Sequence, residues 1–99
     1  MSGHGDGTRV VRAGMPEAAQ GEPFMPGPVL AGPFHLQGDV ASSDWLYTRY
    51  GNPGWARYEA ALAELEGGEV VLFASGMAAA TALLLTSLPP GSAIAMDHH

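Results

Sequence analysis

The arrangement of apolar and polar residues changes near Trp45. Before it, glycine and proline recur, and no apolar periodicity lasts for two helical turns. After it, apolar residues recur at the spacing i, i+3, i+4 and i+7, which places them on one face of a helix. These residues are Tyr58, Ala61, Leu62 and Leu65. Asn52 followed by Pro53 is a typical helix start and Gly67-Gly68 a typical stop, so a helix is predicted between them.

After this helix, the pattern changes to a short β-branched and aromatic run and then to a stretch rich in alanine and leucine. Residues 69–74 are predicted to form a buried strand, residues 77–88 a buried helix, and residues 92–96 the next strand. A strand–helix–strand unit with a short first turn implies a parallel pair of strands with a right-handed crossover. The predicted fold class is therefore α/β, with a parallel βαβ unit.

Two strands and two helices that are apolar on several faces cannot cover one another. A parallel sheet needs helices on both faces and usually more strands. We therefore expect the chain to be a piece of a larger protein, and less so a subunit that completes its core with a partner.

Residues 1–46 have a different character. Their prolines exclude a continuous helix and hold the preceding residues in extended conformations. Two interpretations stay open: a disordered leader, or an extended arm that packs on another part of the protein. Scattered apolar residues such as Phe24, Leu30 and Phe34 favour the arm. Nothing in this region resembles a secretory signal.

Composition excludes several classes of protein. The 99 residues include no cysteine and no lysine, and the net charge is -6. A disulfide scaffold, a thiolate metal site and a lysine Schiff base within this chain are thereby excluded. The negative charge argues against nucleic acid or an anionic membrane as a partner. Residues 70–96 lack charge over a length that could cross a bilayer, but their polar residues and the Pro89-Pro90-Gly91 break favour a buried core.

Two short segments are candidate anion sites. Ser75-Gly76-Met77 joins a predicted strand to a predicted helix, where unpaired amides and the helix dipole favour a phosphate. Tyr47 and Arg49 precede a helix cap, and an arginine fork can bind two oxygens of a phosphate or carboxylate. The plainer interpretations are a turn chosen for packing and a solvated arginine. Asp97-His98-His99 could ligate a metal, but no further ligands are spaced to join it, so we expect no metal site.

Three blocks in register resemble the cystathionine gamma-synthase and gamma-lyase family, the Cys/Met-metabolism enzymes that use pyridoxal 5'-phosphate. The blocks are residues 47–53 (YTRYGNP), 62–68 (LAELEGG) and 73–79 (FASGMAA). Two positions depart from the family pattern: Gly54 stands where the family has threonine, and Tyr50 stands where a smaller residue is usual. The family's Pro-Ile…Ser-Thr-Phe block also has only a weak echo, around residues 28–29 and 32–34. Because that block lies near the substrate channel in relatives, the resemblance leaves the substrate open.

The resemblance implies a site and a fold. The turn formed by Ser75, Gly76 and Met77 would hold the cofactor phosphate, and Tyr47 and Arg49 would reach it from the neighbouring subunit. It also implies a cytoplasmic homo-oligomer, a dimer of dimers, that acts on a small amino acid. Residues 1–46 would be the amino-terminal arm, and residues 47–99 the beginning of the large domain of fold type I.

The resemblance further implies gamma-elimination or gamma-replacement on a sulfur amino acid. Cystathionine gamma-lyase is the first choice. Cystathionine gamma-synthase, methionine gamma-lyase and O-acylhomoserine sulfhydrylase are the alternatives. In this family the Schiff-base lysine and the other catalytic residues lie downstream, so the 99 residues alone are expected to be inactive and to hold no catalytic residue. The rival hypothesis is a small anion-binding or interaction module without catalysis.

Overall fold

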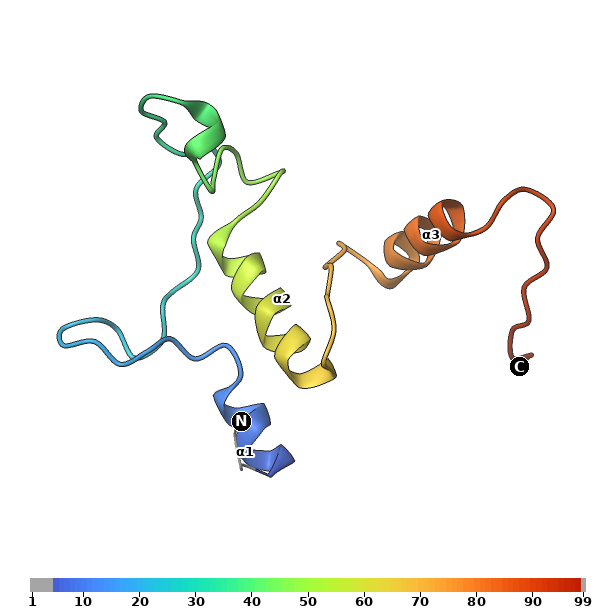
Figure 1. The fold of residues 1–99 in the computed structure, drawn as a ribbon, viewed down its shortest axis with the longest axis horizontal. Helices are drawn as coiled ribbons and strands as arrows, with labels where there is room; N and C mark the ends of the chain where they lie inside the picture. The colour runs from blue at the N-terminus through green and yellow to red at the C-terminus, as the bar shows by residue number, and fades with distance from the viewer. Residues whose placement is uncertain (1–4, 99) are drawn as a thin grey trace.

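Three α-helices joined by extended segments make up the computed structural model, which describes residues 5–98. The helices are α1 (Asp6–Arg12), α2 (Pro53–Glu66) and α3 (Gly76–Ser87), and one 3₁₀ turn, η1, spans Val40–Ser42. As Figure 1 shows, α2 lies in the middle, with the amino-terminal arm on one side and α3 on the other. The radius of gyration is 18.1 Å, whereas a compact domain of this length has about 13 Å.

Helix α2 begins and ends as its sequence predicts. The Asn52 Oδ1 atom accepts a hydrogen bond of 2.8 Å from the Gly54 amide, and Pro53 occupies the first turn. At the other end Gly67 adopts the left-handed conformation, with φ of 72°, and its amide donates to the Ala63 carbonyl at 2.9 Å. A residue other than glycine is strained in this conformation. Both predicted boundaries are confirmed.

The predicted helix over residues 77–88 is also confirmed. As α3 it spans Gly76–Ser87, so it begins and ends one residue earlier than predicted. Ser75 is its N-cap, and Leu88 follows its last turn. Alanine and leucine favour this helix intrinsically, and the Ser75 cap adds to that preference. Its large side chains face solvent: Met77, Leu83 and Leu85 are 75%, 64% and 78% exposed.

The predicted strands at residues 69–74 and 92–96 are absent, because residues 5–98 contain only one isolated antiparallel bridge, between Pro33 and Tyr47. The parallel βαβ unit is therefore not formed within this part of the chain. A strand exists only beside a hydrogen-bonded neighbour, and neither segment has one here. Instead, the Leu72 amide donates a hydrogen bond of 2.8 Å to the Glu59 Oε1 atom on α2.

The part of the chain that the structure describes has no hydrophobic core. None of its apolar side chains is buried. Asn52, which is 3% exposed, is the only buried residue among residues 5–98. Phe24 and Leu30 of the arm are 83% and 92% exposed. Since burial of apolar surface is the main favourable term in folding, residues 5–98 gain little stability from it in this structure.

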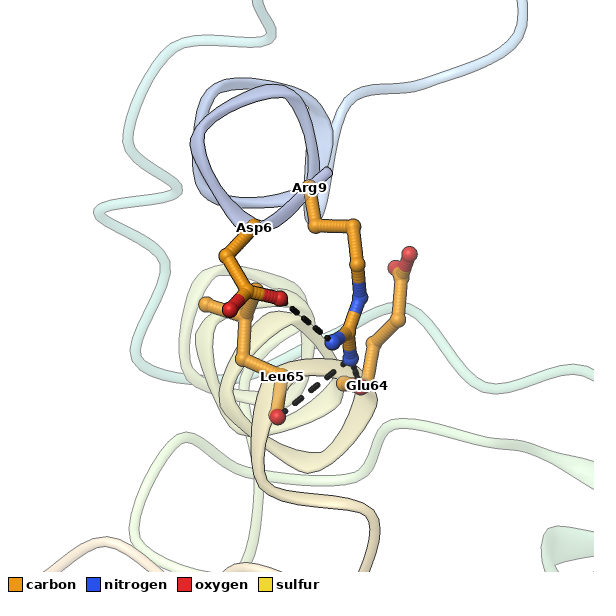
Figure 2. A network of polar contacts seen from close by, with 4 residues as sticks. All are labelled: Asp6, Arg9, Glu64 and Leu65. Atoms are coloured by element: carbon orange, nitrogen blue, oxygen red, sulfur yellow. Dashed lines mark hydrogen bonds and ion pairs between the residues drawn. The ribbon is translucent and has the colours of Figure 1, made fainter. Parts of the chain in front are cut away.

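Helix α1 is an element that sequence analysis did not predict. The Arg9 side chain crosses to α2, where its Nη2 atom donates to the carbonyls of Glu64 at 2.9 Å and Leu65 at 3.4 Å (Figure 2). These carbonyls belong to the last turn of α2, which carries partial negative charge and lacks helical donors. Arg9 also pairs with Asp6 at 3.4 Å. Because Asp6 is almost fully exposed, this ion pair adds little stability.

Beyond α1 the arm lies against the same helix. Gly14 has φ of +73°, and a Cβ atom added there would meet the Ala61 Cβ atom at 2.7 Å. Both the conformation and the close approach therefore require glycine. Further along, the Arg57 Nη1 atom on α2 donates to the Pro26 carbonyl at 3.4 Å. The arm thus contacts α2 of its own chain.

Replacing Arg9 by alanine in the full-length protein should detach α1 from α2. With the two hydrogen bonds to α2 lost, amides of α1 should exchange with deuterium roughly fivefold faster. Hydrogen exchange read by mass spectrometry measures this effect. Arg12→Ala is the matched control, since Arg12 is an exposed arginine of the same helix without such a bond. Equal exchange in the two variants would contradict the assignment.

Candidate phosphate-binding site

The first part of the site is the turn at residues 47–50, which precedes α2 and is hydrogen-bonded to the arm. We call this contact with the arm the clasp and define it by the side chains of Asn52 and Thr48 with the carbonyls of Val29 and Ala31. The Asn52 Nδ2 atom donates to the Val29 carbonyl at 3.0 Å and to the Thr48 hydroxyl at 3.3 Å. The Thr48 hydroxyl in turn donates to the Ala31 carbonyl. Each polar atom in this chain of hydrogen bonds is therefore satisfied.

Backbone hydrogen bonds extend this contact on both sides of Tyr47, at Leu46 and at Thr48. The Thr48 amide donates to the Gly32 carbonyl at 2.8 Å, and the Phe34 amide donates to the Leu46 carbonyl at 3.2 Å. The bridge between Pro33 and Tyr47 lies between these bonds. The arm therefore lies antiparallel to the segment that carries the candidate residues Tyr47 and Arg49.

Tyr47 and Arg49 lie together. The Arg49 Cζ atom is 5.2 Å from the centre of the Tyr47 ring, in a cation–π contact. Residues 47–50 form a turn in which the Tyr50 amide donates to the Tyr47 carbonyl at 2.9 Å. Arg49 is exposed and forms no hydrogen bond or ion pair within residues 5–98. All its guanidinium donors are thus free for an anion.

The second part of the site is the start of α3. The Ser75 Oγ atom accepts a hydrogen bond of 3.0 Å from the Ala78 amide, and the Ala79 amide begins the helical pattern by donating to the Ser75 carbonyl at 3.1 Å. The amides of Gly76 and Met77 have no acceptor among the described residues. A Cβ atom added at Gly76 would meet nothing within 4 Å, so the approach is open. Free amides and the helix dipole suit a phosphate.

These two parts do not meet within one chain. Tyr47 and Arg49 precede the amino-terminal end of α2, whereas Ser75 follows its carboxyl-terminal end by several residues. A helix of 14 residues is about 21 Å long. In Figure 1, α3 lies well away from the turn that precedes α2. The sequence-predicted residues therefore lie in two separate groups, one before α2 and one at the start of α3.

The other candidate features add no site. His99 lies outside the described residues, and residues 5–98 contain no group of three histidine, aspartate or glutamate side chains that could hold a metal. No helix in this range is long and apolar enough to cross a membrane. A groove of about 370 Å³ between the arm and α2 is lined by Gly14, Met25, Arg57 and others, but by none of the predicted site residues.

Sequence analysis identified Asn52 only as a helix cap and did not single out Thr48. The spacing of four between them placed a hydroxyl and an amide at the same turn, which is a usable signal for a side-chain pair. Their acceptors, the carbonyls of Val29 and Ala31, are main-chain atoms 23 and 17 residues earlier. No side-chain pattern reveals such partners.

Residues 8–99 match the family of Cys/Met metabolism PLP-dependent enzymes. The chain belongs to this family. Membership confirms the resemblance noted from the three sequence blocks, and the family is one that depends on pyridoxal 5'-phosphate and has fold type I. The blocks at residues 47–53, 62–68 and 73–79 all lie within the matched range.

Curated relatives are gamma-lyases by name. A protein of Streptomyces coelicolor provisionally named cystathionine gamma-lyase is 50% identical over 95 residues, which covers 91% of this chain and 24% of the relative. An L-methionine gamma-lyase of Streptomyces avermitilis is 61% identical over 53 residues, or 52% of this chain and 13% of that protein. An L-methionine gamma-lyase of Brevibacterium sandarakinum is 54% identical over 48 residues, which cover 48% of this chain and 12% of that protein. The chain thus spans a quarter or less of each of these relatives, and no solved structure matches it.

The cap of α3 can be tested with Ser75→Ala in the full-length protein without cofactor. Loss of the hydroxyl acceptor should cost the start of the helix about 1 kcal/mol and speed the exchange of its first amides. Ser75→Thr, which retains a hydroxyl, should behave almost like the wild type. Ser87→Ala, at the far end of the same helix, is the control. Hydrogen exchange that is unchanged in Ser75→Ala would refute the cap.

Proposed function

We propose that this chain is the amino-terminal part of a pyridoxal 5'-phosphate-dependent enzyme that catalyses gamma-elimination or gamma-replacement on a sulfur amino acid. The observation that carries the proposal is the Ser75-Gly76-Met77 turn, whose two free amides lie in a chain that belongs to this family. Cystathionine gamma-lyase is the first choice, because the relative with that name matches 91% of the chain. Methionine gamma-lyase is the second, since two relatives with that name match about half of the chain.

The residues present suit the cofactor's phosphate. When bound, the cofactor supplies an electron sink for the substrate's carbanion. The amides of Gly76 and Met77 donate hydrogen bonds to the phosphate, and the positive end of the α3 dipole stabilises its charge. The Ser75 hydroxyl, which accepts from Ala78, has its own hydrogen left to donate. The Schiff-base lysine comes from the rest of the protein, because this chain has none.

Tyr47 and Arg49 complete the phosphate site of the neighbouring subunit in this proposal. Support comes from the separation of the two groups of site residues, which we call half-sites, by the length of α2 within one chain and from the free guanidinium of Arg49. A two-fold axis would bring each half-site to its counterpart, which makes a dimer the smallest functional unit and a dimer of dimers the expected assembly. The protein acts on a small amino acid in the cytoplasm.

The remainder of the protein also completes the fold. Residues 69–74 and 92–96 become parallel strands when neighbouring strands supply their hydrogen bonds, and α3 then covers one face of the sheet. Residues 1–46 remain the arm, and residues 47–99 begin the large domain. The uncovered apolar side chains of residues 5–98 support this proposal over a self-contained anion-binding module.

Arg49→Ala in the full-length protein should weaken cofactor binding by about tenfold or more, since a charge-assisted bidentate contact to the phosphate is lost. Titration of the cofactor-free protein with pyridoxal 5'-phosphate measures the dissociation constant. Arg12→Ala, which changes an exposed arginine of α1, should bind the cofactor like the wild type. If Arg49→Ala retains wild-type affinity, Arg49 does not hold the phosphate.

A further inference from the structure

The clasp holds the only buried side chain among the described residues. Asn52 is 3% exposed, although the segment around it buries no apolar side chain. Its Oδ1 atom caps α2 through Gly54, while its Nδ2 atom reaches the arm at Val29 and the turn at Thr48. One amide group therefore connects the arm, the turn and the helix.

The N-cap of α2 does not by itself require asparagine. Aspartate, serine and threonine cap helices about as well, because a cap needs only an oxygen acceptor. Ionised aspartate has no donor, and serine and threonine have a single O–H, so none of them offers the two N–H donors that asparagine has beside its capping oxygen. In Asn52 these donors make two hydrogen bonds that join the arm to the turn, and Thr48 relays one of them to the Ala31 carbonyl.

Unlike Asn52, Arg49 has no side-chain hydrogen bond within residues 5–98 that would hold its side chain in one position. Its only recorded contact in residues 5–98 is with the ring of Tyr47, itself 39% exposed and bridged to the arm at Pro33. A long arginine side chain that ends in solvent retains several rotamers. The backbone of the turn sets the direction in which the Arg49 side chain leaves the chain. The clasp holds that backbone at Thr48 and at Asn52, on either side of Arg49.

We propose that Asn52 and Thr48 are positioning residues for phosphate binding: through the clasp they hold the Tyr47–Arg49 turn in the geometry in which Arg49 meets the cofactor's phosphate. The inference rests on the proposed function, because it assigns the ligand of Arg49 to that phosphate. It gives the arm an indirect role in phosphate binding, through the clasp. It also assigns a function to the amide nitrogen of Asn52 that helix capping does not use.

Two pairs of variants in the full-length protein test the proposal. Asn52→Asp retains the oxygen that caps α2 but replaces the donor by a second acceptor, which faces the Val29 carbonyl. Thr48→Val removes the hydroxyl with little change in shape, and Thr48→Ser restores it. The probes are pyridoxal 5'-phosphate and pyridoxal, titrated separately into cofactor-free protein. Only the first carries a phosphate.

A positioning role predicts a selective loss. Asn52→Asp and Thr48→Val should each weaken binding of pyridoxal 5'-phosphate by about tenfold, while binding of pyridoxal stays unchanged and Thr48→Ser behaves like the wild type. A merely structural role would weaken both probes alike, and this result would overturn the proposal. Wild-type affinity for the phosphate form in both variants would also overturn it. If Asn52→Asp does not fold, the Thr48 pair decides.

A double-variant cycle separates this inference from the proposed function. If Asn52 acts through Arg49, Asn52→Asp should cause no further loss of pyridoxal 5'-phosphate affinity in a protein that already carries Arg49→Ala. Additive losses would overturn the positioning role while leaving Arg49 as a phosphate ligand. A wild-type protein that does not bind the cofactor would refute the proposed function itself.

Discussion

A buried primary amide has to satisfy both its oxygen and its nitrogen, because an unpaired polar group without water costs free energy. Asn52 meets this constraint with bonds to three different segments, and no other side chain in the described part of the chain is buried. The start of α2, the register of the arm and the shape of the turn before α2 are therefore set at one point. Arg9 repeats the arrangement more weakly at the other end of α2, where its guanidinium meets exposed carbonyls.

A second constraint is the lack of cover for apolar surface. Helix α3 exposes large side chains such as Leu83 and Leu85, and residues 69–74 have no neighbouring strand. Glu59 supplies a single acceptor to this segment, at Leu72. The chain spans 24% of the Streptomyces coelicolor relative. The start of α3 is nevertheless already formed, because a serine cap and helix-favouring residues need no distant partner.

The features that could be predicted from sequence are those with local causes. Helix α2 is defined by Asn52, Pro53 and Gly67, which all act within one helical turn, and α3 follows from its composition and from Ser75. The predicted strands were wrong for residues 5–98, because a strand needs a hydrogen-bonded neighbour and the apolar pattern of one segment does not show whether such a neighbour is present. Helix α1 was missed because the acceptors of Arg9 lie 55 and 56 residues later. The candidate site was recognised as motifs, whereas the clasp that orients one of its halves depends on main-chain carbonyls and could not be inferred from residue types.

The central claim is that two separate half-sites on this chain, the Tyr47–Arg49 turn and the start of α3, bind the same phosphate group from two subunits. A crystal structure of the full-length protein with pyridoxal 5'-phosphate tests it most directly. We predict phosphate oxygens within hydrogen-bonding distance of the Gly76 and Met77 amides of one subunit and of the Arg49 guanidinium of its neighbour. A phosphate held elsewhere, or an Arg49 that faces solvent in the assembled protein, would contradict the account.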